Sequence, residues 1–422
     1  MIGAASTGSP VGAPARPVVV IGAGQAGLAV SHSLTDLGVE HTVLEQHRVA
    51  QAWRDRWDSF TLVTPNWTLD LPGMPYAGDD PEGHVPRTDI VDYLEHYAEQ
   101  CRAHLRERVL VTALHVATSP RFTLDTSAGQ VHAGTVIVCT GAYQRPFRPT
   151  AAHEFRPGLR VMDATAYRSP AALPDGKVLV VGSGQTGVQL TEELHLAGRD
   201  VFLSCGRAPW VPRRLDGTDI VTWLARTNFF DQSLDCLPSP AARLGANIQA
   251  TGARGGHDLH FRTLQKLGVP LLGRFSGVHG TRATFADDLA ASVAFGDGRW
   301  AQFRQILREQ LPANGFPVPE LPEPAPFRST PPTELGLRDF GAVIFTAGYR
   351  PDYSWIAAPV TDPMGFPLCV DGASTIVPGL SFCGVHFLRT RRSSLLFGVG
   401  TDARIVARGV AARVGSEPTG GG

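Results

Sequence analysis

The chain has 422 residues, of which 43% are hydrophobic and 18% are charged, and its formal net charge is −1. This is the composition of a globular protein with two or three domains and a large apolar core. The nearly neutral charge gives no electrostatic basis for binding nucleic acid or an anionic membrane. No run of eighteen apolar residues is present to span a bilayer.

Residues 1–16 are small and polar and contain Pro and Gly, without the basic start and apolar stretch of a secretory signal. We predict a disordered tail there and another over 415–422. The six cysteines form no C-x-x-C pair, which argues against a zinc site and against a dithiol redox pair. Free thiols favour a cytoplasmic protein.

The first ordered segment predicts a strand over 17–21, which leads into the sequence Gly-Ala-Gly-Gln-Ala-Gly at 22–27. The spacing of leucine and valine after this turn predicts a helix that ends at Gly38, and residues 41–45 predict the next strand. Strand, glycine turn, helix and strand make a βαβ unit.

The same pattern returns 160 residues later. A strand is predicted over 177–181, and the sequence Gly-Ser-Gly-Gln-Thr-Gly follows at 182–187. The next segments predict a helix that ends at Gly198 and a strand over 200–204. The chain therefore carries two βαβ units of one design.

Each glycine motif has the spacing of a dinucleotide-binding turn. The first glycine makes the tight turn, the second lets the backbone approach a pyrophosphate, and the third lets helix and strand pack closely. The helix that follows offers free N–H groups and a partial positive charge to the phosphates. The glycines in these three roles are Gly22, Gly24 and Gly27 in the first unit and Gly182, Gly184 and Gly187 in the second.

The ends of the second strands distinguish the two nucleotides. Glu45 lies 23 residues after Gly22, where a carboxylate accepts hydrogen bonds from a ribose 2′-OH, and this suits FAD. Ser204 occupies the matching place in the second unit, and Arg207 follows it closely. An acid would repel a 2′-phosphate, whereas Ser and Arg bind one, so the second unit favours NADPH over NADH. Alternatively, Arg207 belongs to a solvated loop.

Further segments complete the chain. Residues 135–139 and 342–345 predict buried strands, which end in Thr140-Gly141 and in Thr346-Ala347-Gly348. Residues 312–332 contain eight prolines and predict a stiff surface connection. Residues 378–412 are typical of a strand, a loop and a closing helix. His257 and His260 are three residues apart, but Asp258 is expected to cap a helix there, so no metal site is predicted.

With two such units in this order, the sequence resembles the class B flavoprotein monooxygenases, which include flavin-containing monooxygenases, YUCCA-type enzymes and Baeyer–Villiger enzymes. It is most similar to a bacterial branch often labelled "putative flavoprotein involved in potassium transport". The resemblance runs from about Val18 to Ala412. The segments that carry it are Gly22–Ala29, Trp53–Asp58, Leu62–Pro65, Leu71–Gly73, Thr140-Gly141 with Pro146 and Pro149, Gly182–Gly187, Pro212–Arg214, Thr346–Tyr349 and Ser393–Ala403.

The resemblance implies an α/β fold with two doubly wound Rossmann-type domains, the NADPH domain being inserted into the FAD domain. The FAD domain is expected over 17–170 and 346–414, and the NADPH domain over 171–345 with a substrate-region insertion at 210–332. Trp53 and the segment near Asp402 would contact FAD. The residues expected to bind the two cofactors are Gly22, Gly24, Gln25, Gly27, Glu45, Trp53, Thr140, Gly141, Gly182, Gly184, Gln185, Thr186, Gly187, Ser204, Arg207, Thr346, Gly348 and Asp402.

The activity implied by the resemblance is monooxygenation, in which NADPH reduces FAD, O₂ adds to the flavin, and a peroxyflavin transfers one oxygen to a small organic substrate. The family fingerprint is matched at Phe155, Gly158 and Tyr167, but Asp163 stands where the family has His. This departure leaves open an NADPH-dependent flavin reductase or dehydrogenase without oxygen insertion. A non-catalytic flavin-binding redox sensor is a third possibility, which the two intact glycine motifs disfavour. No partner other than substrate and O₂ is expected, and the oligomeric state is not predicted.

Two residues are candidates for a catalytic role. Asn66 is an offset counterpart of a catalytic-region Asn in flavin-containing monooxygenases, and its alternative is a turn residue after proline. Arg392 belongs to a basic cluster with Arg389 and Arg391. The cluster either forms a solvated loop or contacts the flavin or an acidic substrate group.

Overall fold

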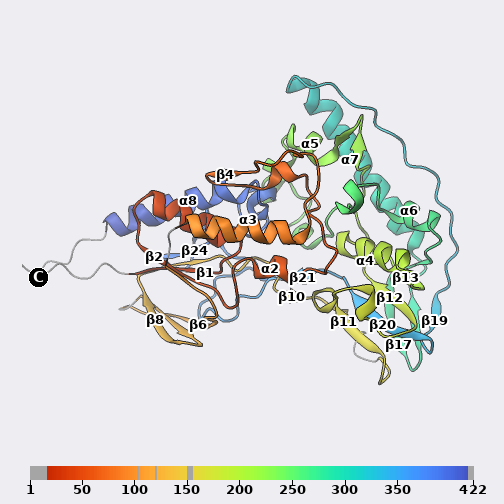
Figure 1. Cartoon of the computed structure of the whole chain (residues 1–422), viewed down its shortest axis with the longest axis horizontal. Coiled ribbons are helices and arrows are strands. Elements are labelled where there is room, and N and C mark those ends of the chain that lie inside the picture. Colours follow the sequence, from red (N-terminus) through yellow and green to blue (C-terminus); the bar gives the residue numbers. More distant parts are fainter. Residues whose placement is uncertain (1–16, 102–103, 119–120, 150–154, 417–422) are drawn as a thin grey trace, which may run out of the picture.

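The structure is a computed structural model that describes residues 17–101, 104–118, 121–149 and 155–416, and these form two lobes (Figure 1). We call residues 17–149 and 346–416 the first lobe and residues 155–345 the second. The tail predicted over 1–16 and most of the one predicted over 415–422 lie outside the described residues, although the last helix continues through Ser416.

The first lobe is built on a seven-stranded sheet with the order β22-β23-β24-β9-β1-β2-β5. The strands from β24 to β5 are parallel, and β22 and β23 form an antiparallel edge. Their bounds are β1 Val18–Ile21, β2 His41–Leu44, β5 His104–Arg106, β9 Thr135–Val138, β22 Cys369–Val370, β23 Ala373–Ser374 and β24 Leu380–Phe382. The central strands are fully buried, as their β-branched sequences predict.

Different layers cover the two faces of this sheet. Helices α1 (Gln25–Asp36), α3 (Arg87–Gln100) and α8 (Val399–Ser416) lie on one face. The other face is covered by an antiparallel sheet of β6 (Val111–Val116), β7 (Phe122–Thr126) and β8 (Gly129–Ala133). A short helix, α2 (Gln51–Arg54), and a hairpin of β3 (Asp70–Leu71) and β4 (Met74–Pro75) follow β2.

The second lobe repeats this plan. Its parallel sheet has the order β11-β20-β12-β13-β16, with bounds β11 Arg160–Asp163, β12 Lys177–Val181, β13 Val201–Ser204, β16 Leu271–Leu272 and β20 Phe340–Phe345. Helices α4 (Gln185–Leu196) and α6 (Phe261–Lys266) cover one face. An antiparallel sheet of β17 (Phe275–His279), β18 (Arg282–Phe285) and β19 (Glu334–Gly336) covers the other.

This architecture corrects the expected doubly wound form. Over the described residues, each parallel sheet has its helices on one face and a three-stranded antiparallel sheet on the other. A β-meander buries the apolar face of a sheet as well as a helix does, because its inner side chains alternate with solvent-facing ones. The sequence of β6 to β8 carries that alternation in its buried Leu114, Phe122 and Leu124.

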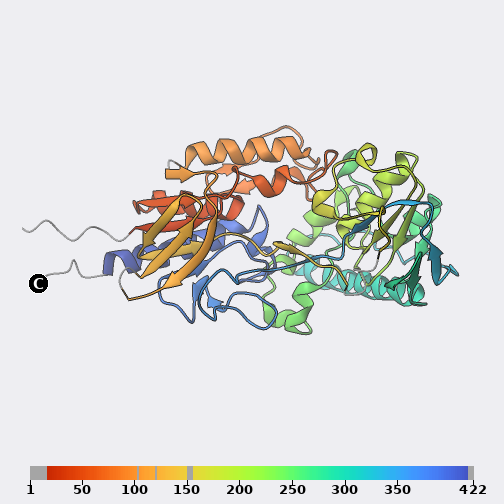
Figure 2. The ribbon, with the colours of Figure 1, turned by 90° about the horizontal axis from the view of Figure 1, so that it is seen from below.

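The lobe boundaries also differ from those expected. Strand β11 pairs with β20, so the second lobe begins before Arg160 and not near residue 171. Within the expected insertion 210–332, β16 belongs to the parallel sheet and β17 and β18 to the meander. Two strands, β10 (Arg145–Pro146) and β21 (Tyr349–Arg350), pair antiparallel where the chain passes between the lobes (Figure 2).

The remaining part of the second lobe is a helical layer with its own core. It contains the hairpin β14 (Arg214–Leu215) and β15 (Thr218–Asp219), helix α5 (Ile220–Ala225) and the long helix α7 (Leu289–Ala313). The proline-rich connection begins inside α7, which includes Pro312, and residues 315–332 then run without helix or strand as expected.

Both lobes also contain short 3-10 helices. These are Asn66–Thr68, Ala164–Ala166, Pro170–Ala172, Phe229–Asp231, Leu234–Cys236, Pro240–Leu244, Ala253–Gly255 and Arg391–Ser394.

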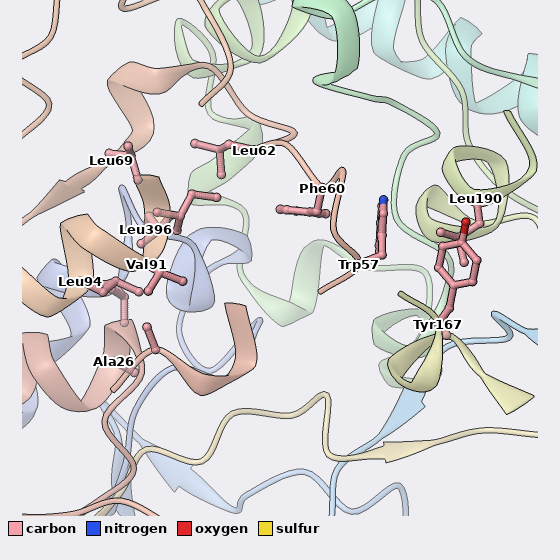
Figure 3. Packing of buried hydrophobic residues seen from close by; sticks show 14 of the residues in the cluster. Ala26, Trp57, Phe60, Leu62, Leu69, Val91, Leu94, Tyr167, Leu190 and Leu396 are labelled. Carbon is pink, nitrogen blue, oxygen red and sulfur yellow. The ribbon is translucent and has the colours of Figure 1, made fainter. Parts of the chain in front are cut away.

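One buried cluster extends from the first lobe into the second. It includes Ala26 of α1 and Leu94 of α3 together with Leu190 of α4. Trp57 and Phe60, whose rings meet edge to face at 5.0 Å, belong to the same cluster and lie between these groups (Figure 3). The Trp53–Asp58 segment thus helps to fix the lobes to each other. In the part of the chain that the structure describes, no helix combines the length and the apolarity needed to cross a membrane.

Candidate functional site

The first glycine turn lies between β1 and α1. Gly22 has φ +104°, and a Cβ there would lie 2.8 Å from the carbonyl oxygen of Cys139. A Cβ at Gly27 would lie 1.8 Å from the carbonyl oxygen of Gly22. A Cβ at Gly24, by contrast, would have no described heavy atom within 4 Å apart from those of Gly24 itself and its two neighbours in the sequence. The first and third glycines are therefore required by packing, and the second faces open space, as a pyrophosphate site requires.

The carboxylate expected at the end of β2 is in place. Glu45 is buried, and its Oε2 accepts a hydrogen bond of 2.8 Å from the amide of Ala23 in the glycine turn. Its Oε1 accepts one of 2.9 Å from the amide of His47. These bonds hold the carboxylate beside the turn, where the adenosine ribose of a bound dinucleotide would reach it.

Gln25 and Trp53 form a bridge at the start of α1. The indole N–H of Trp53 donates to Gln25 Oε1 over 3.1 Å, and Gln25 Nε2 donates to the carbonyl oxygen of Ser394 over 3.2 Å. The bridge joins the first turn to the closing segment of the lobe. The structure thus brings together three of the segments that carry the family resemblance.

The second glycine turn is built by the same contacts. A Cβ at Gly182 would lie 2.8 Å from the carbonyl of Thr346, and one at Gly187 would lie 1.9 Å from the carbonyl oxygen of Gly182. The hydroxyl of Thr346 donates to Gly182 O over 2.6 Å. Thr346 therefore supports the turn from the end of β20, and its hydroxyl is already engaged by protein.

Gly184 differs from its counterpart Gly24. A Cβ at Gly184 would lie 3.3 Å from Cβ of Ala246. Gln185 Nε2 donates to the carbonyl oxygen of Ile248 over 3.1 Å, and Gln249 Nε2 donates to Ser183 O over 2.7 Å. The segment 246–249 therefore covers the second turn, and a nucleotide at that turn has to share its space or displace it. No pattern in the sequence indicates this cover.

The end of β13 carries a basic recess. Ser204 is buried, and its hydroxyl donates to Gly273 O over 3.0 Å, so contact with a phosphate would require this bond to change. Arg207 is exposed and lines a cavity of about 230 Å³ together with Arg274, Asp288 and Ser292. Arg274 was not predicted, because it follows β16, 67 residues after Arg207 in the sequence.

Of the remaining expected cofactor residues, Thr140 and Gly141 follow β9, Gly348 follows β20, and Thr186 lies in α4. Thr140 is exposed after β9, and Gly141, with φ +71°, offers its carbonyl to the hydroxyl of Tyr353 at 2.7 Å. Thr186 is half-buried in the first turn of α4, and Gly348 has φ +91°. A wider hollow of about 490 Å³ lies at the opposite, amino ends of the second sheet's strands, away from both glycine turns.

Asp402 lies in the first turn of α8 and is buried. Its Oδ1 accepts a hydrogen bond of 3.2 Å from Arg389 Nη1, and burial raises the pKa of this carboxyl above its usual value, while Ser393 and Arg389 oppose the shift. The pair fixes the closing helix to the loop before it. The other carboxylate oxygen, Oδ2, has no hydrogen-bond partner among the described residues, and the expected contact of this segment with FAD stays a prediction.

Asn66 has a structural role, which corrects the catalytic candidate. Its side chain is buried, with Nδ2 donating to Asp80 O over 2.9 Å and Oδ1 accepting from the amide of Val85 over 2.7 Å. Both ends of the amide thus hold the segment 80–85. The alternative of a turn residue after Pro65 is the one that agrees with the structure, since Asn66 begins a 3-10 helix.

The basic cluster divides between two environments. Arg392 forms an ion pair of 2.5 Å with Asp231, so its charge is compensated by the second lobe. Arg391 stacks between the rings of Phe229 and Phe387, at 4.2 and 4.8 Å, and donates to Phe229 O. Burial lowers the pKa of Arg391 to about 10, which leaves it charged at neutral pH. Both arginines connect the lobes, and neither is free in a solvated loop.

The fingerprint positions and the paired histidines have clear partners. Asp163 forms a bidentate pair with Arg148 at 2.7 and 2.9 Å. His257 pairs with Glu192 at 2.7 Å, and His260, not Asp258, caps α6. Asp258 instead accepts a hydrogen bond of 2.6 Å from the amide of Arg213. The described residues contain no group of three or more His, Cys, Asp or Glu side chains arranged for a metal ion.

Comparisons with known proteins agree with these features. Residues 19–228 match the family described as pyridine nucleotide-disulphide oxidoreductase. A protein of Geobacillus kaustophilus named uncharacterized oxidoreductase CzcO-like is 29% identical over 92% of this chain and 95% of its own length. The probable indole-3-pyruvate monooxygenase YUCCA4 of Arabidopsis thaliana is 29% identical over 42% of this chain and 43% of its own. The structure of a flavin-containing monooxygenase from Stenotrophomonas maltophilia matches with a TM-score of 0.67 and 20% identity, over 94% of this chain and 98% of that one.

Proposed function

Since the chain belongs to the class B flavoprotein monooxygenase family, we propose that it is an FAD-dependent, NADPH-using monooxygenase of a small organic substrate. FAD would bind in the first lobe and NADPH in the second, which is inserted into the first along the chain. The observation that carries the proposal is the pair of glycine turns, each at the carboxyl edge of a parallel sheet and each closed by the same contacts. Such an edge is where dinucleotides bind.

The residues of the first turn fit FAD. Gly24 faces open space, and the start of α1 has no side-chain cap among the described residues, so its N–H groups remain available to a pyrophosphate. Glu45 would accept the ribose hydroxyls, and the Gln25–Trp53 bridge would hold the turn against the closing segment. When bound, FAD supplies the redox and oxygen-activating chemistry, and the protein binds, orients and excludes water.

The recess at the end of β13 supports NADPH over NADH. Arg207 and Arg274 line one cavity, and a 2′-phosphate placed there would meet two cationic groups. Asp288 shares the cavity and lies 3.6 Å from Arg274, so it holds that guanidinium in place while partly offsetting its charge. We therefore assign the greater part of the phosphate contact to Arg207.

Substitution of Arg207 by alanine tests this assignment. A charge-assisted hydrogen bond contributes about 1.5–3 kcal/mol, so Arg207→Ala is expected to lower kcat/KM for NADPH by about tenfold or more and to leave NADH nearly unchanged. Steady-state assays with both nucleotides measure the difference. Arg282→Ala is the matched control, because this exposed arginine pairs with Glu334 and lies outside the recess. An equal loss with both nucleotides would show that Arg207 does not bind the 2′-phosphate.

Labelled oxygen tests the monooxygenase assignment. The purified protein, supplied with NADPH and ¹⁸O₂, is expected to place one labelled oxygen atom in an organic product and the other in water. Mass spectrometry of products from a panel of small amines, sulfides and ketones provides the measurement. NADPH consumption with all label recovered as hydrogen peroxide, across every substrate, would contradict oxygen transfer.

The second candidate function is NADPH-dependent flavin reduction without oxygen insertion. Asp163 favours it, since this position carries His in the family fingerprint and here is neutralised by Arg148. An electron acceptor such as a quinone, reduced at the expense of NADPH without label in any product, would support this candidate.

A further inference from the structure

Arg213 contacts both lobes, although neither glycine turn uses it. It precedes β14 and is only 2% exposed. Its Nη2 lies 2.6 Å from Oδ2 of Asp219 in the same hairpin and donates over 2.7 Å to the carbonyl oxygen of Val63 in the first lobe. The same nitrogen lies 3.1 Å from Nε2 of His84. Val63 O and His84 Nε2 accept the two hydrogens of Nη2, and Asp219 adds an ion pair, so this edge of the guanidinium is fixed from both lobes.

His84 completes the contact from the first-lobe side. Its Nδ1 lies 3.0 Å from Leu62 O and 3.2 Å from Thr64 O, and therefore carries the hydrogen. Burial, followed by the charge of Arg213, lowers the pKa of His84 to about 4, so the ring is neutral at pH 7. Nε2 is then the acceptor that faces Arg213. His84 thereby holds the Leu62–Thr64 backbone and the Arg213 side chain in one network.

Two glycines of the second lobe close around this network. A Cβ at Gly256, where φ is +77°, would lie 2.8 Å from His84 Nε2 and 3.0 Å from Arg213 Nε. A Cβ at Gly252 would lie 2.0 Å from Leu62 O and 3.0 Å from Cβ of His84. The backbone of the second lobe therefore packs so closely against Leu62 and His84 that no side chain fits at either glycine.

The segment that this network holds, Leu62–Thr64, belongs to the same lobe as the first glycine turn, where FAD is proposed to bind. Trp53 is hydrogen-bonded to Gln25 at the start of α1, and Leu62–Thr64 begins nine residues later within the same lobe. We propose that Arg213 is a positioning residue, which holds Leu62–Thr64 of the first lobe against the second and so sets the distance across which hydride passes from NADPH, which is oxidised, to FAD, which is reduced. This inference rests on the proposed cofactor sites.

Anaerobic stopped-flow reduction of the FAD-loaded protein tests the role. Arg213→Met keeps most of the side-chain volume and removes the charge and the donors. It is expected to lower the limiting rate of flavin reduction by about tenfold or more and to enlarge the isotope effect with NADPH deuterated at nicotinamide C4, while the Kd for NADPH changes by less than about threefold. Arg226→Met is the control, because Arg226 stacks on Trp223 and Phe316 within the second lobe. A lower thermal midpoint with an unchanged limiting rate and isotope effect would overturn the proposal.

A second variant and a second measurement keep the test decisive. Arg213→Met combined with Asp219→Asn leaves no unpaired buried charge and is used if the single variant does not fold. Hydrogen exchange is expected to rise in residues 61–86 and 213–222 of either variant and to stay unchanged elsewhere. If NADPH does not reduce the flavin of the wild-type protein, the proposed function fails. The hydrogen-exchange measurement alone then decides whether Arg213 holds the two lobes together. Unchanged exchange in both segments would overturn the inference.

Discussion

The substitution Gly24→Leu is expected to weaken FAD binding by about a hundredfold or more without unfolding the protein. The backbone at Gly24 is extended, with φ −81° and ψ −175°, which any residue adopts, and the described residues leave free space around a Cβ there. A pyrophosphate at the start of α1 needs that space. Loss of two charge-assisted hydrogen bonds, each worth about 1.5–3 kcal/mol, raises the Kd for FAD by about a hundredfold or more.

Flavin absorbance and titration of the apoprotein with FAD measure this effect. Gly409→Leu is the matched control, since Gly409 lies in α8 and a Cβ at that position likewise has no described atom within 4 Å. Far-ultraviolet circular dichroism checks that both variants remain folded. A folded Gly24→Leu protein with a full complement of FAD would show that the first turn does not bind this cofactor.

The two βαβ units were predictable because their signals are local. The β-branched strands, the glycine spacing and the helix stops at Gly38 and Gly198 all lie within about thirty residues of each other, and the structure places β1, α1, β12 and α4 within a residue or two of the expected bounds. Glu45 was predictable for the same reason, because the end of β2 returns to the turn it follows.

Contacts between distant segments could not be predicted in the same way. Asn66 looked available for chemistry, and only the fold shows that Asp80 and Val85 use both ends of its amide. The cover of Gly184 by Ala246 and the approach of Arg274 to Arg207 depend on where loops return after passing through other elements. The two antiparallel sheets that cover the parallel sheets in place of outer helices are built from short strands. Buried and exposed side chains alternate along such strands over only a few residues, so their sequence pattern is weak.

Acidification from pH 6.5 to 4 is expected to destabilise the fold strongly. Burial lowers the pKa of each of His84, His260 and His386 to about 4. In the unfolded chain these side chains titrate near their ordinary value of about 6.5. The folded protein thus holds the neutral rings, the unfolded chain binds more protons, and the stabilisation is complete above pH 6.5 and is lost as the pH falls towards 4.

The expected slope follows from proton linkage. Each buried histidine changes the free energy of unfolding by up to about 1.4 kcal/mol per pH unit in this window, or about 3 kcal/mol over the whole window. The three histidines together contribute up to about 10 kcal/mol, against about 5–15 kcal/mol for a typical domain. Urea unfolding at pH 7.5, 6 and 5 measures the slope, with FAD and without it. His260→Gln should reduce the slope by about a third of the three-histidine total, whereas His96→Gln, at a side chain that is 63% exposed, should leave it unchanged. A free energy of unfolding that stays level between pH 6.5 and 5 would contradict this prediction, because it would mean that these rings accept protons inside the folded protein. Their surroundings, including the His84–Arg213 contact, would then open far more readily than the packing around them implies.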